Sequence, residues 1–294
     1  SQIEALAPVL TIDKRVKWTN GYGTITGDGN LEGADAGDLI TFIINITNMG
    51  HHRAFDMCMN DTIQVPEGGF FTDLTALEVV FRNGTPCNCV TQVGTDAQGY
   101  PIYLTVNLTD PIPPGDSVLV TYNLTLTERV EPRQLLIDNA SILRYASMPG
   151  GDNFVDPRDP LEDDAYVRIA SPGLSKHLES STEDFTSDSK RELAIGENAT
   201  FSLVITLPEG RVENLTITDT LPSGFTYIDG SFVLDTSNFN GDVPTPQVTY
   251  DPVSRVLTVF FEGWLNVTAD NDQSNNSFKV FFDVHVLDDV GANH

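Results

Sequence analysis

Hydrophobic and polar residues alternate with a period of two along most of the chain. Such alternation is typical of β-strands that have one face in a core and the other in solvent. Turn-rich pieces such as Pro113-Pro114-Gly115-Asp116 separate the alternating segments. The clearest segments cover residues 9–16, 102–108, 118–126, 201–207, 256–261 and 278–287. No segment has the period of an amphipathic helix, so the pattern predicts an all-β protein whose antiparallel sheets pack face to face.

One module occurs twice. Residues 37–47 align without a gap onto residues 196–206, and each segment opens with a glycine and an acidic residue before an alternating strand. Two later blocks recur in the same order: Asp61-Thr62-Ile63 as Asp219-Thr220-Leu221, and the run 117–130 as 277–290. With a linker near Ala170 to Gly173, the repeat predicts two domains, 1–170 and 171–294.

The second copy lacks a segment that the first copy has. Residues 137–145 form a further alternating run, which we expect to pair with 118–126 or its neighbour, whereas the second copy ends at His294 without it. A sandwich without its last strand exposes unpaired backbone groups and an apolar groove. Residues 1–7 have no core role in the repeat, so they are predicted to add as a strand to the second domain of the next subunit. The alternative is a natural chain that continues past His294 and supplies its own strand.

Composition and charge narrow the class of protein and the kinds of partner it can bind. A hydrophobic fraction of 40% is that of a globular protein rather than a disordered one. A formal charge of −26 argues against nucleic acid or an anionic membrane as partner, but it leaves cations and cationic partners open. No stretch approaches the roughly 20 apolar residues of a membrane span. A chain that opens at Ser1 without Met is expected to be a processed piece of a longer precursor.

Glycosylation sequons are strongly enriched. Chance would place about three N-x-[ST] sequons in a chain of this composition, and ten are present. They begin at Asn45, Asn60, Asn83, Asn107, Asn123, Asn139, Asn198, Asn214, Asn266 and Asn275. Alternation puts Ile40, Phe42, Ile44 and Ile46 in the core and Asn45 on the opposite face. It likewise puts Asn107 opposite Leu104, and Asn123 opposite Val120, Tyr122 and Leu124. The enrichment predicts a secreted eukaryotic glycoprotein with N-linked glycans on its outer sheet faces, against the simpler alternative that Asn and Thr populate exposed strands.

The three cysteines, Cys58, Cys87 and Cys89, all lie in the first module. An oxidising compartment favours one disulfide, which we expect between Cys58 and either Cys87 or Cys89, because cysteines two residues apart rarely meet disulfide geometry. The third thiol is then either buried and free or a link to another chain.

Some of these motifs resemble a known family. The Gly-Asp turn into a strand that ends Thr-Asn-x-Gly (residues 37–50), and the Leu207-Pro208-Glu209-Gly210 segment with residues 216–231, are similar to the repeat called domain of unknown function eleven. That resemblance implies tandem immunoglobulin-like sandwiches with mechanical and adhesive roles. The dense sequons point to an algal or protist surface filament, such as a flagellar hair, rather than to bacteria.

An acidic loop before the first Gly-Asp strand is a candidate calcium site. Asp28, Asn30, Asp35 and Asp38 bring oxygen ligands into one glycine-rich loop, as a hard cation such as Ca²⁺ requires. The spacing is not that of an EF-hand, and the simpler reading is a solvated acidic loop.

Catalytic motifs are missing from the sequence. The five histidines come with no Gly-x-Ser-x-Gly, His-Glu-x-x-His or phosphate-binding loop. Surface sandwiches related to the resembled family carry isopeptide bonds between a lysine on the first strand and an asparagine on the last. Lys14 and Asn139 stand in roughly those positions, but Asn139 is also a sequon residue, so no such bond is expected.

These features predict a non-enzymatic, glycosylated, extracellular structural protein, the repeating subunit of a filament on or outside the cell. The alternative is an adhesin or receptor ectodomain fragment that binds a protein or a carbohydrate.

Overall fold

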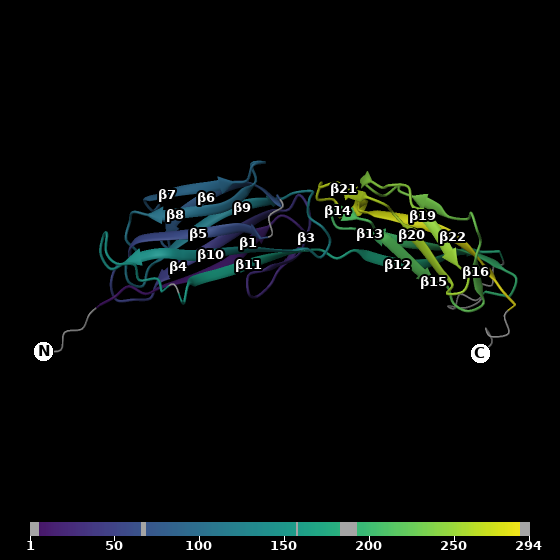
Figure 1. Cartoon of the computed structure of the whole chain (residues 1–294), viewed down its shortest axis with the longest axis horizontal. Helices are drawn as coiled ribbons and strands as arrows, with labels where there is room; N and C mark the ends of the chain where they lie inside the picture. The colour runs from purple at the N-terminus through teal and green to yellow at the C-terminus, as the bar shows by residue number, and fades with distance from the viewer. Residues whose placement is uncertain (1–5, 66–68, 157, 183–192, 289–294) are drawn as a thin grey trace. The chain divides into compact units, whose positions relative to one another are not determined.

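The computed structural model describes residues 6–65, 69–156, 158–182 and 193–288 (Figure 1). Within them the regular structure is β-strand apart from one short 3₁₀ turn, Gln273–Asn275. The chain divides into two compact units, Ser1–Ala170 (module 1) and Ser171–His294 (module 2), at the predicted boundary. Most of the long polar loop expected over residues 180–190 lies outside the described residues.

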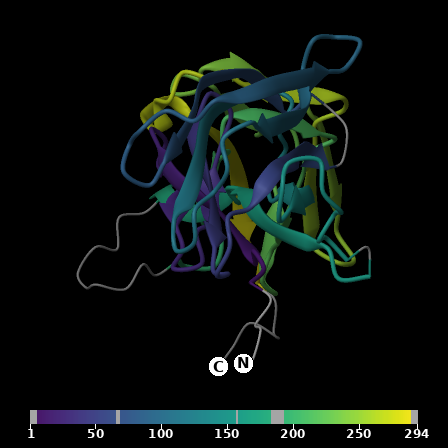
Figure 2. The same cartoon turned by 90° about the vertical axis from the view of Figure 1, so that its left-hand side faces the viewer.

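Module 1 is a sandwich of two sheets (Figures 1 and 2). One sheet has the order β1-β4-β9-β6 and the other β2-β3-β11-β10-β5-β8-β7. The bounds are β1 Leu10–Thr19, β2 Thr24–Ile25, β3 Leu31–Ala34, β4 Leu39–Asn48, β5 Phe55–Val65, β6 Phe71–Phe81, β7 Cys89–Thr95, β8 Pro101–Leu108, β9 Ser117–Leu126, β10 Leu135–Ala146 and β11 Leu161–Ile169.

Alternation sets the core of module 1. On β4 the predicted inward residues Ile40, Phe42, Ile44 and Ile46 are all fully buried, while Asn45 and its alternate neighbours are partly exposed. This burial pattern confirms the period-two assignment. The apolar face of the strand turns to the core because burying each such side chain is worth about 1.5–3 kcal/mol.

The position of β10 differs from the expected one. It pairs with β5 on one side and β11 on the other, in the sheet opposite β9, and not beside residues 118–126 or their neighbours. The hairpin β10–β11 extends the β5 edge and also covers β1: the Lys14 N–H donates to Asp163 Oδ2 of β11 over 2.6 Å. Sequence alternation shows that a segment is a strand but does not show which sheet it joins.

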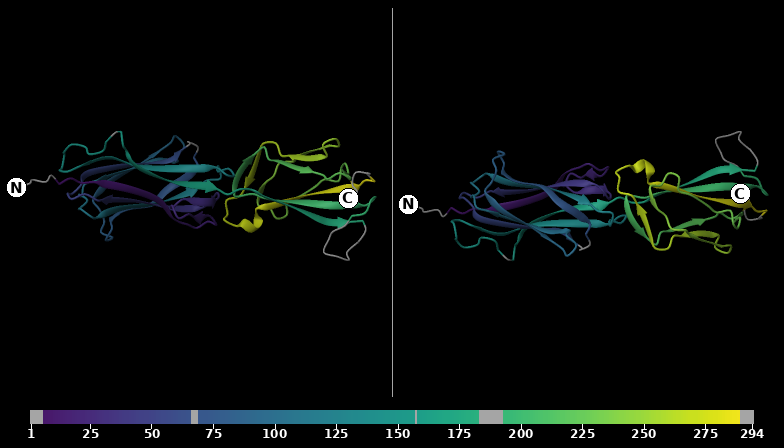
Figure 3. Two further views of the ribbon diagram at one scale, coloured as in Figure 1. Left: turned by 90° about the horizontal axis from the view of Figure 1, so that it is seen from below. Right: turned by 90° about the horizontal axis from the view of Figure 1, so that it is seen from above.

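Module 2 repeats this plan with shorter strands (Figure 3). One sheet has the order β12-β13-β22-β16, with β17 also paired to β22; the opposite layer is formed by β14-β21-β18 and β15-β20-β19. The bounds are β12 Gly173–Ser181, β13 Asn198–Thr206, β14 Gly210–Glu213, β15 Thr216–Thr220, β16 Phe225–Tyr227, β17 Val233–Asp235, β18 Gly241–Asp242, β19 Gln247–Asp251, β20 Val256–Phe260, β21 Trp264–Val267 and β22 Ser277–Val286.

The register shows which strands correspond. Lys14 of β1 lies opposite Ile44, and Lys176 of β12 lies opposite Leu203, the repeat partner of Ile44. By the same alignment β15 corresponds to β5 and β22 to β9. Across the described residues of module 2 no strand corresponds to β10 or to β11, and β15 pairs only with β20. The part of module 1 that has no counterpart in the described residues of module 2 is therefore a hairpin, not the single strand that the sequence suggested.

Candidate functional site: a buried lysine and carboxylate cluster

Lys14 is the largest charged side chain in the interior of the described chain. It is 1% exposed and points inward from β1 at a position where alternation calls for an apolar residue. A buried ammonium group costs several kcal/mol unless charged and polar partners compensate it. The surroundings of Lys14 are therefore the first place to look for a specific function.

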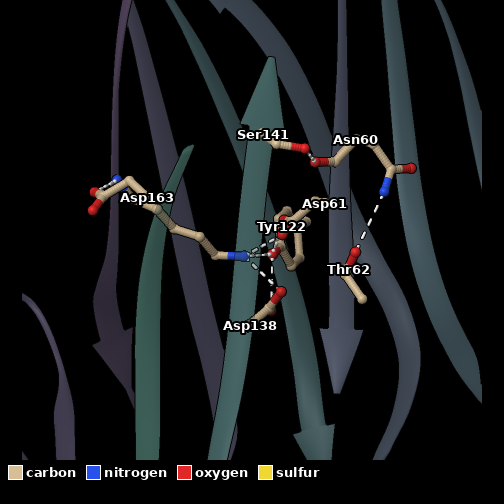
Figure 4. A network of polar contacts seen from close by, with 8 residues as sticks. Asn60, Asp61, Thr62, Tyr122, Asp138, Ser141 and Asp163 are labelled. Atoms are coloured by element: carbon tan, nitrogen blue, oxygen red, sulfur yellow. Dashed lines mark hydrogen bonds and ion pairs between the residues drawn. The ribbon is translucent and has the colours of Figure 1, made fainter. Parts of the chain in front are cut away.

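Three polar side chains from three strands surround the Lys14 ammonium (Figure 4). Nζ donates to Asp61 Oδ1 on β5 and, over 3.0 Å, to the Tyr122 hydroxyl on β9. Asp138 Oδ1 on β10 lies 2.6 Å from Nζ and makes no hydrogen bond. The Tyr122 hydroxyl is 2.5 Å from Asp61 Oδ2 and 3.1 Å from Asp138 Oδ2, so it can donate its one proton to either of these oxygens. The cluster thus joins both sheets across the core.

Burial sets the protonation of the cluster. It raises the pKa of Asp138 well above the ordinary value, and the nearby charge of Asp61 raises it further. Burial also raises the pKa of Tyr122 well above 10, helped by both carboxylates, so the phenol keeps its proton. Two carboxyl groups that share one ammonium cannot both be ionised at low cost. The raised pKa favours the protonated form of Asp138, so that the two carboxyl groups hold one negative charge beside the Lys14 ammonium.

Aromatic rings enclose the ammonium. Phe42 and Tyr122 stack with centroids 5.6 Å apart, and Lys14 Nζ lies 5.3 Å and 5.7 Å from those two centroids. Cation–π attraction at such distances is favourable in a desolvated site. The rings also shield the contact between Lys14 and Asp138 from water.

Module 2 contains half of the same cluster. Lys176 Nζ lies 2.6 Å from Asp219 Oδ2 and over the rings of Phe201 and Phe282. Lys176, Asp219 and Phe282 are the repeat partners of Lys14, Asp61 and Tyr122. Phe282 lacks the hydroxyl, and the strand that would carry the counterpart of Asp138 has no equivalent in the described residues. Lys176 is accordingly 33% exposed in its side chain.

Asn139, the residue that the resemblance sets against Lys14, is not the one that faces it. Asn139 lies in register with Thr62 and Asp164, whereas Asp138 faces Lys14. Adjacent residues of a strand point to opposite faces, so the two cannot both meet the lysine. Counting inward positions from the buried Leu136 and Ala140 would have selected Asp138.

The sequons occupy the faces that the sequence predicted for the three strand sites considered. Asn107 is exposed, and Asn45 and Asn123 are partly exposed beside strand neighbours that are buried. The Asn123 Oδ1 accepts from Thr41 on the neighbouring strand, and the Asn45 Oδ1 from Thr47, so both hydrogen bonds lie on this outer face.

We expect these three asparagines, Asn45, Asn107 and Asn123, to carry N-glycans in the native material. Their side chains point away from the core, where a transferase can reach them, because burying an unpaired amide costs a few kcal/mol. Intact-glycopeptide mass spectrometry measures the occupancy. Mostly unmodified peptides at all three sites would contradict the expectation.

The three cysteines are free thiols in the structure, unlike the pair expected from the sequence. Asn107 of β8 pairs with Cys58 on one side and with Val90 on the other, so β8 separates Cys58 from Cys89. Two strand spacings of about 4.8 Å exceed the reach of a disulfide. Burial raises the pKa of Cys87 to about 11 and also raises that of the other two thiols.

The candidate calcium ligands lie in two turns. Asp28 and Asn30 lie between β2 and β3, and Asn30 Oδ1 already accepts from the Tyr166 N–H over 2.8 Å. Asp35 and Asp38 lie between β3 and β4, and both are buried. Over the described residues no group of three or more His, Cys, Asp or Glu side chains is placed to hold a metal ion.

Calcium binding at this loop stays a prediction with a direct test. If Ca²⁺ binds Asp28, Asn30, Asp35 and Asp38, chelation should lower the melting temperature and expose residues 21–37 to protease. Thermal unfolding and limited proteolysis with chelator or with excess Ca²⁺ measure this. Identical curves in both conditions would exclude the site.

The Gly-acid motif that opens each repeat has a structural role. Asp38 Oδ2 accepts from the Asp35 N–H over 3.1 Å, and the Glu197 carboxylate accepts in the same way from the Ala194 N–H. In both modules the acidic side chain closes the turn before the strand. Gly37 and Gly196 precede it with φ of 86° and 89°, values that favour glycine.

Comparisons with known proteins give only distant likenesses. No protein-family model and no curated protein matches the chain. Among solved structures, the chain is similar to the C-terminal domain of the Streptococcus agalactiae antigen I/II polypeptide BspA, with 10% identity, a TM-score of 0.39 and coverage of 94% of this chain and 91% of that one. The C-terminal domain of the Streptococcus pyogenes antigen I/II-family protein AspA gives 8% identity, a TM-score of 0.36 and coverage of 95% and 91%.

A third likeness covers less of both chains. The major pilin subunit BcpA of Bacillus cereus matches with 12% identity and a TM-score of 0.34, over 57% of this chain and 42% of that one. With TM-scores below 0.5, these likenesses establish no shared function. No helix in the described part of the chain is long and apolar enough to cross a membrane.

Proposed function

We propose that the chain is a non-enzymatic, extracellular structural protein whose first module is closed by an internal amide bond between Lys14 and Asp138. The contact between Lys14 Nζ and the Asp138 carboxyl, buried and 2.6 Å long, carries this proposal. A covalent tie between the first strand and the β10–β11 hairpin would prevent the sandwich from opening along the β5 edge. Such a tie suits a protein that bears load and not one that turns over a substrate.

The amide bond would form by condensation of Lys14 with Asp138, and the cluster itself supplies every proton donor and acceptor that this reaction needs. The Asp61 carboxylate takes one proton from the Lys14 ammonium, and the neutral amine then attacks Cγ of the protonated Asp138. The C–N bond forms, the C–O bond to the former hydroxyl breaks, and one water molecule leaves. Asp61 ends protonated, so the charges balance and neither oxidant nor co-substrate is required.

Two neighbours favour this reaction over a permanent ion pair. Burial raises the pKa of Asp138 and so favours its protonated form, which is a far better electrophile than a carboxylate. The Tyr122 hydroxyl, 3.1 Å from Asp138 Oδ2, can donate to the oxygen that gains charge as the amine adds. Asp61 is thus the proton acceptor and Tyr122 the oxyanion donor.

Intact mass after glycan removal tests the amide bond. The wild-type chain should be lighter than its sequence by one water molecule, and a crosslinked peptide pair containing Lys14 and Asp138 should appear after digestion. Lys14→Arg keeps the charge but should restore the full mass. A wild-type mass equal to the sequence mass would show that the cluster is only a buried ion pair.

The finer proposal concerns assembly into a glycosylated filament. Its support is the unpaired β15 edge of module 2 together with residues 1–7, of which residues 1–5 lie outside the described part of the chain. Residues from Ala7 onward are tied to module 1, since the Ala7 carbonyl accepts from the His51 N–H over 3.0 Å. The segment available for donation is therefore residues 1–6.

Deletion of residues 1–6 is expected to abolish polymer formation while module 1 stays folded. The truncated subunit should sediment as a monomer under conditions in which the full chain gives filaments in negative-stain images. Circular dichroism and the intact mass of the truncated chain serve as controls, because they report whether it is folded and whether the Lys14–Asp138 bond has formed. Normal filaments from the truncated chain would remove the amino-terminal segment from the mechanism.

A further inference from the structure

We infer that the β15 edge of module 2 is an acceptor site for a β-strand that carries an inward carboxyl side chain, which pairs with Lys176. This deepens the strand-addition part of the proposed function, because it states the chemistry of the donor. It does not depend on the amide bond in module 1.

The β15 edge is able to pair with another strand. Leu221 N–H donates to Arg255 and the Leu215 carbonyl accepts from Phe261, so odd-numbered positions of this strand bond to β20. By the alternation of an antiparallel ladder, the N–H and C=O of Thr216, Thr218 and Thr220 point away from β20. All three threonines are exposed, and no Lys or Pro protects the strand.

The inner face of β12 lacks the cover that β1 has. On β1, Leu10, Lys14 and Val16 are buried, whereas no residue of β12 is buried. The inward position of Leu174 is 59% exposed, and Leu178 is half-buried against the core of module 2. Since both strands have equivalent sheet neighbours, the difference follows from the hairpin that covers β1.

Module 1 shows what kind of strand fits such an edge. Its β10 pairs with β5 and turns Leu136, Asp138, Ala140 and Ile142 to the core, all buried. A matching donor has apolar or small residues at alternate positions and one carboxyl group in the middle. That group would complete around Lys176 the arrangement that Asp138 completes around Lys14.

Residues 1–6 of a second copy are the donor that the filament proposal names. Glu4 is the one carboxylate within residues 1–6, so it is the candidate partner of Lys176 if a second copy is the donor.

A peptide copy of β10 is the direct probe. A labelled peptide of residues 132–147 is titrated with the full-length chain, whose own β10 already fills module 1, and binding is read by fluorescence anisotropy. We expect saturable binding that weakens at least about tenfold when the peptide carries Asp138→Asn, because the desolvated ion pair is lost. A scrambled peptide serves as the control.

Two variants of the chain place the binding on this edge. Thr218→Pro removes an N–H that faces the incoming strand, so it should abolish binding. Lys176→Gln removes the ammonium, so the unchanged peptide and the peptide with Asp138→Asn should then bind with equal affinity. Thr218→Ser, which keeps the N–H at the same position, is the matched control, and circular dichroism verifies that each variant is folded. No binding, or binding that Thr218→Pro leaves intact, would overturn the inference.

A peptide of residues 1–9 separates this inference from the filament proposal. If the β10 peptide binds and the 1–9 peptide does not, the edge accepts strands but a second copy is not their source. In that case the inference stands and the homopolymer proposal fails. If the 1–9 peptide binds and Glu4→Gln weakens it, both stand.

Discussion

Replacing Asp61 with asparagine is expected to lower the stability of module 1 by roughly 4–5 kcal/mol. The amide side chain of the variant cannot accept the lysine proton, so the bond does not form, while Lys14 and Asp138 remain as a charge-neutral pair. The loss then equals the benefit of closing a loop of more than a hundred residues, which the chain-entropy account puts at this size. For a module of this length the melting temperature should fall by roughly 10–15 °C.

Module 2 supplies a matched control for this variant. Asp219→Asn changes the repeat partner of Asp61 and breaks the Lys176–Asp219 ion pair, which is partly exposed. Such a pair contributes at most about 1 kcal/mol, and no amide is proposed there. Calorimetry with intact mass should therefore show a large effect for Asp61 and a small one for Asp219. Equal effects from both variants, with no change in mass, would contradict the internal bond.

Asp38→Asn is expected to stabilise module 1 near neutral pH and to have no such effect near pH 4. Asp38 is fully buried, its Oδ1 has no hydrogen bond, and burial raises its pKa to about 6. The unfolded pKa lies near 4, so between about pH 4 and 6 the folded chain binds more protons than the unfolded chain. Stability from this group is therefore greatest below about pH 4 and falls as the pH rises through 6. The cost in the wild type approaches about 3 kcal/mol above that range.

Urea unfolding at about pH 4 and about pH 7.5, with chelator present, measures this difference. Asparagine keeps an oxygen for the Asp35 N–H and removes the buried charge, so the variant should gain about 1–3 kcal/mol on the wild type at the higher pH. Asp152→Asn, at an exposed position, is the control and should show no pH-dependent gain. A variant that is less stable at both pH values would mean that the turn requires the carboxylate.

The sequence by itself determined the main strands and the repeat. Period-two alternation located β1, β8, β9, β13, β20 and β22 to within a few residues, because each strand buries one face and exposes the other. The repeat indicated two modules that meet near residue 170, and it also paired Asp61 with Asp219 before any contact was known. These are local or one-dimensional properties, which the order of residues carries directly.

Only the tertiary structure decided which inward residues meet. Lys14, Asp61, Tyr122 and Asp138 come from four strands in two sheets, and no spacing along the chain brings them together. The same holds for Cys58 and Cys89, which β8 keeps apart, and for β10, because alternation does not specify which sheet a strand joins. Sheet order and the packing of one sheet on the other arise from contacts between residues tens of positions apart. For that reason the resemblance pointed to Lys14 on the first strand, and only the fold showed that it is buried and which groups surround it.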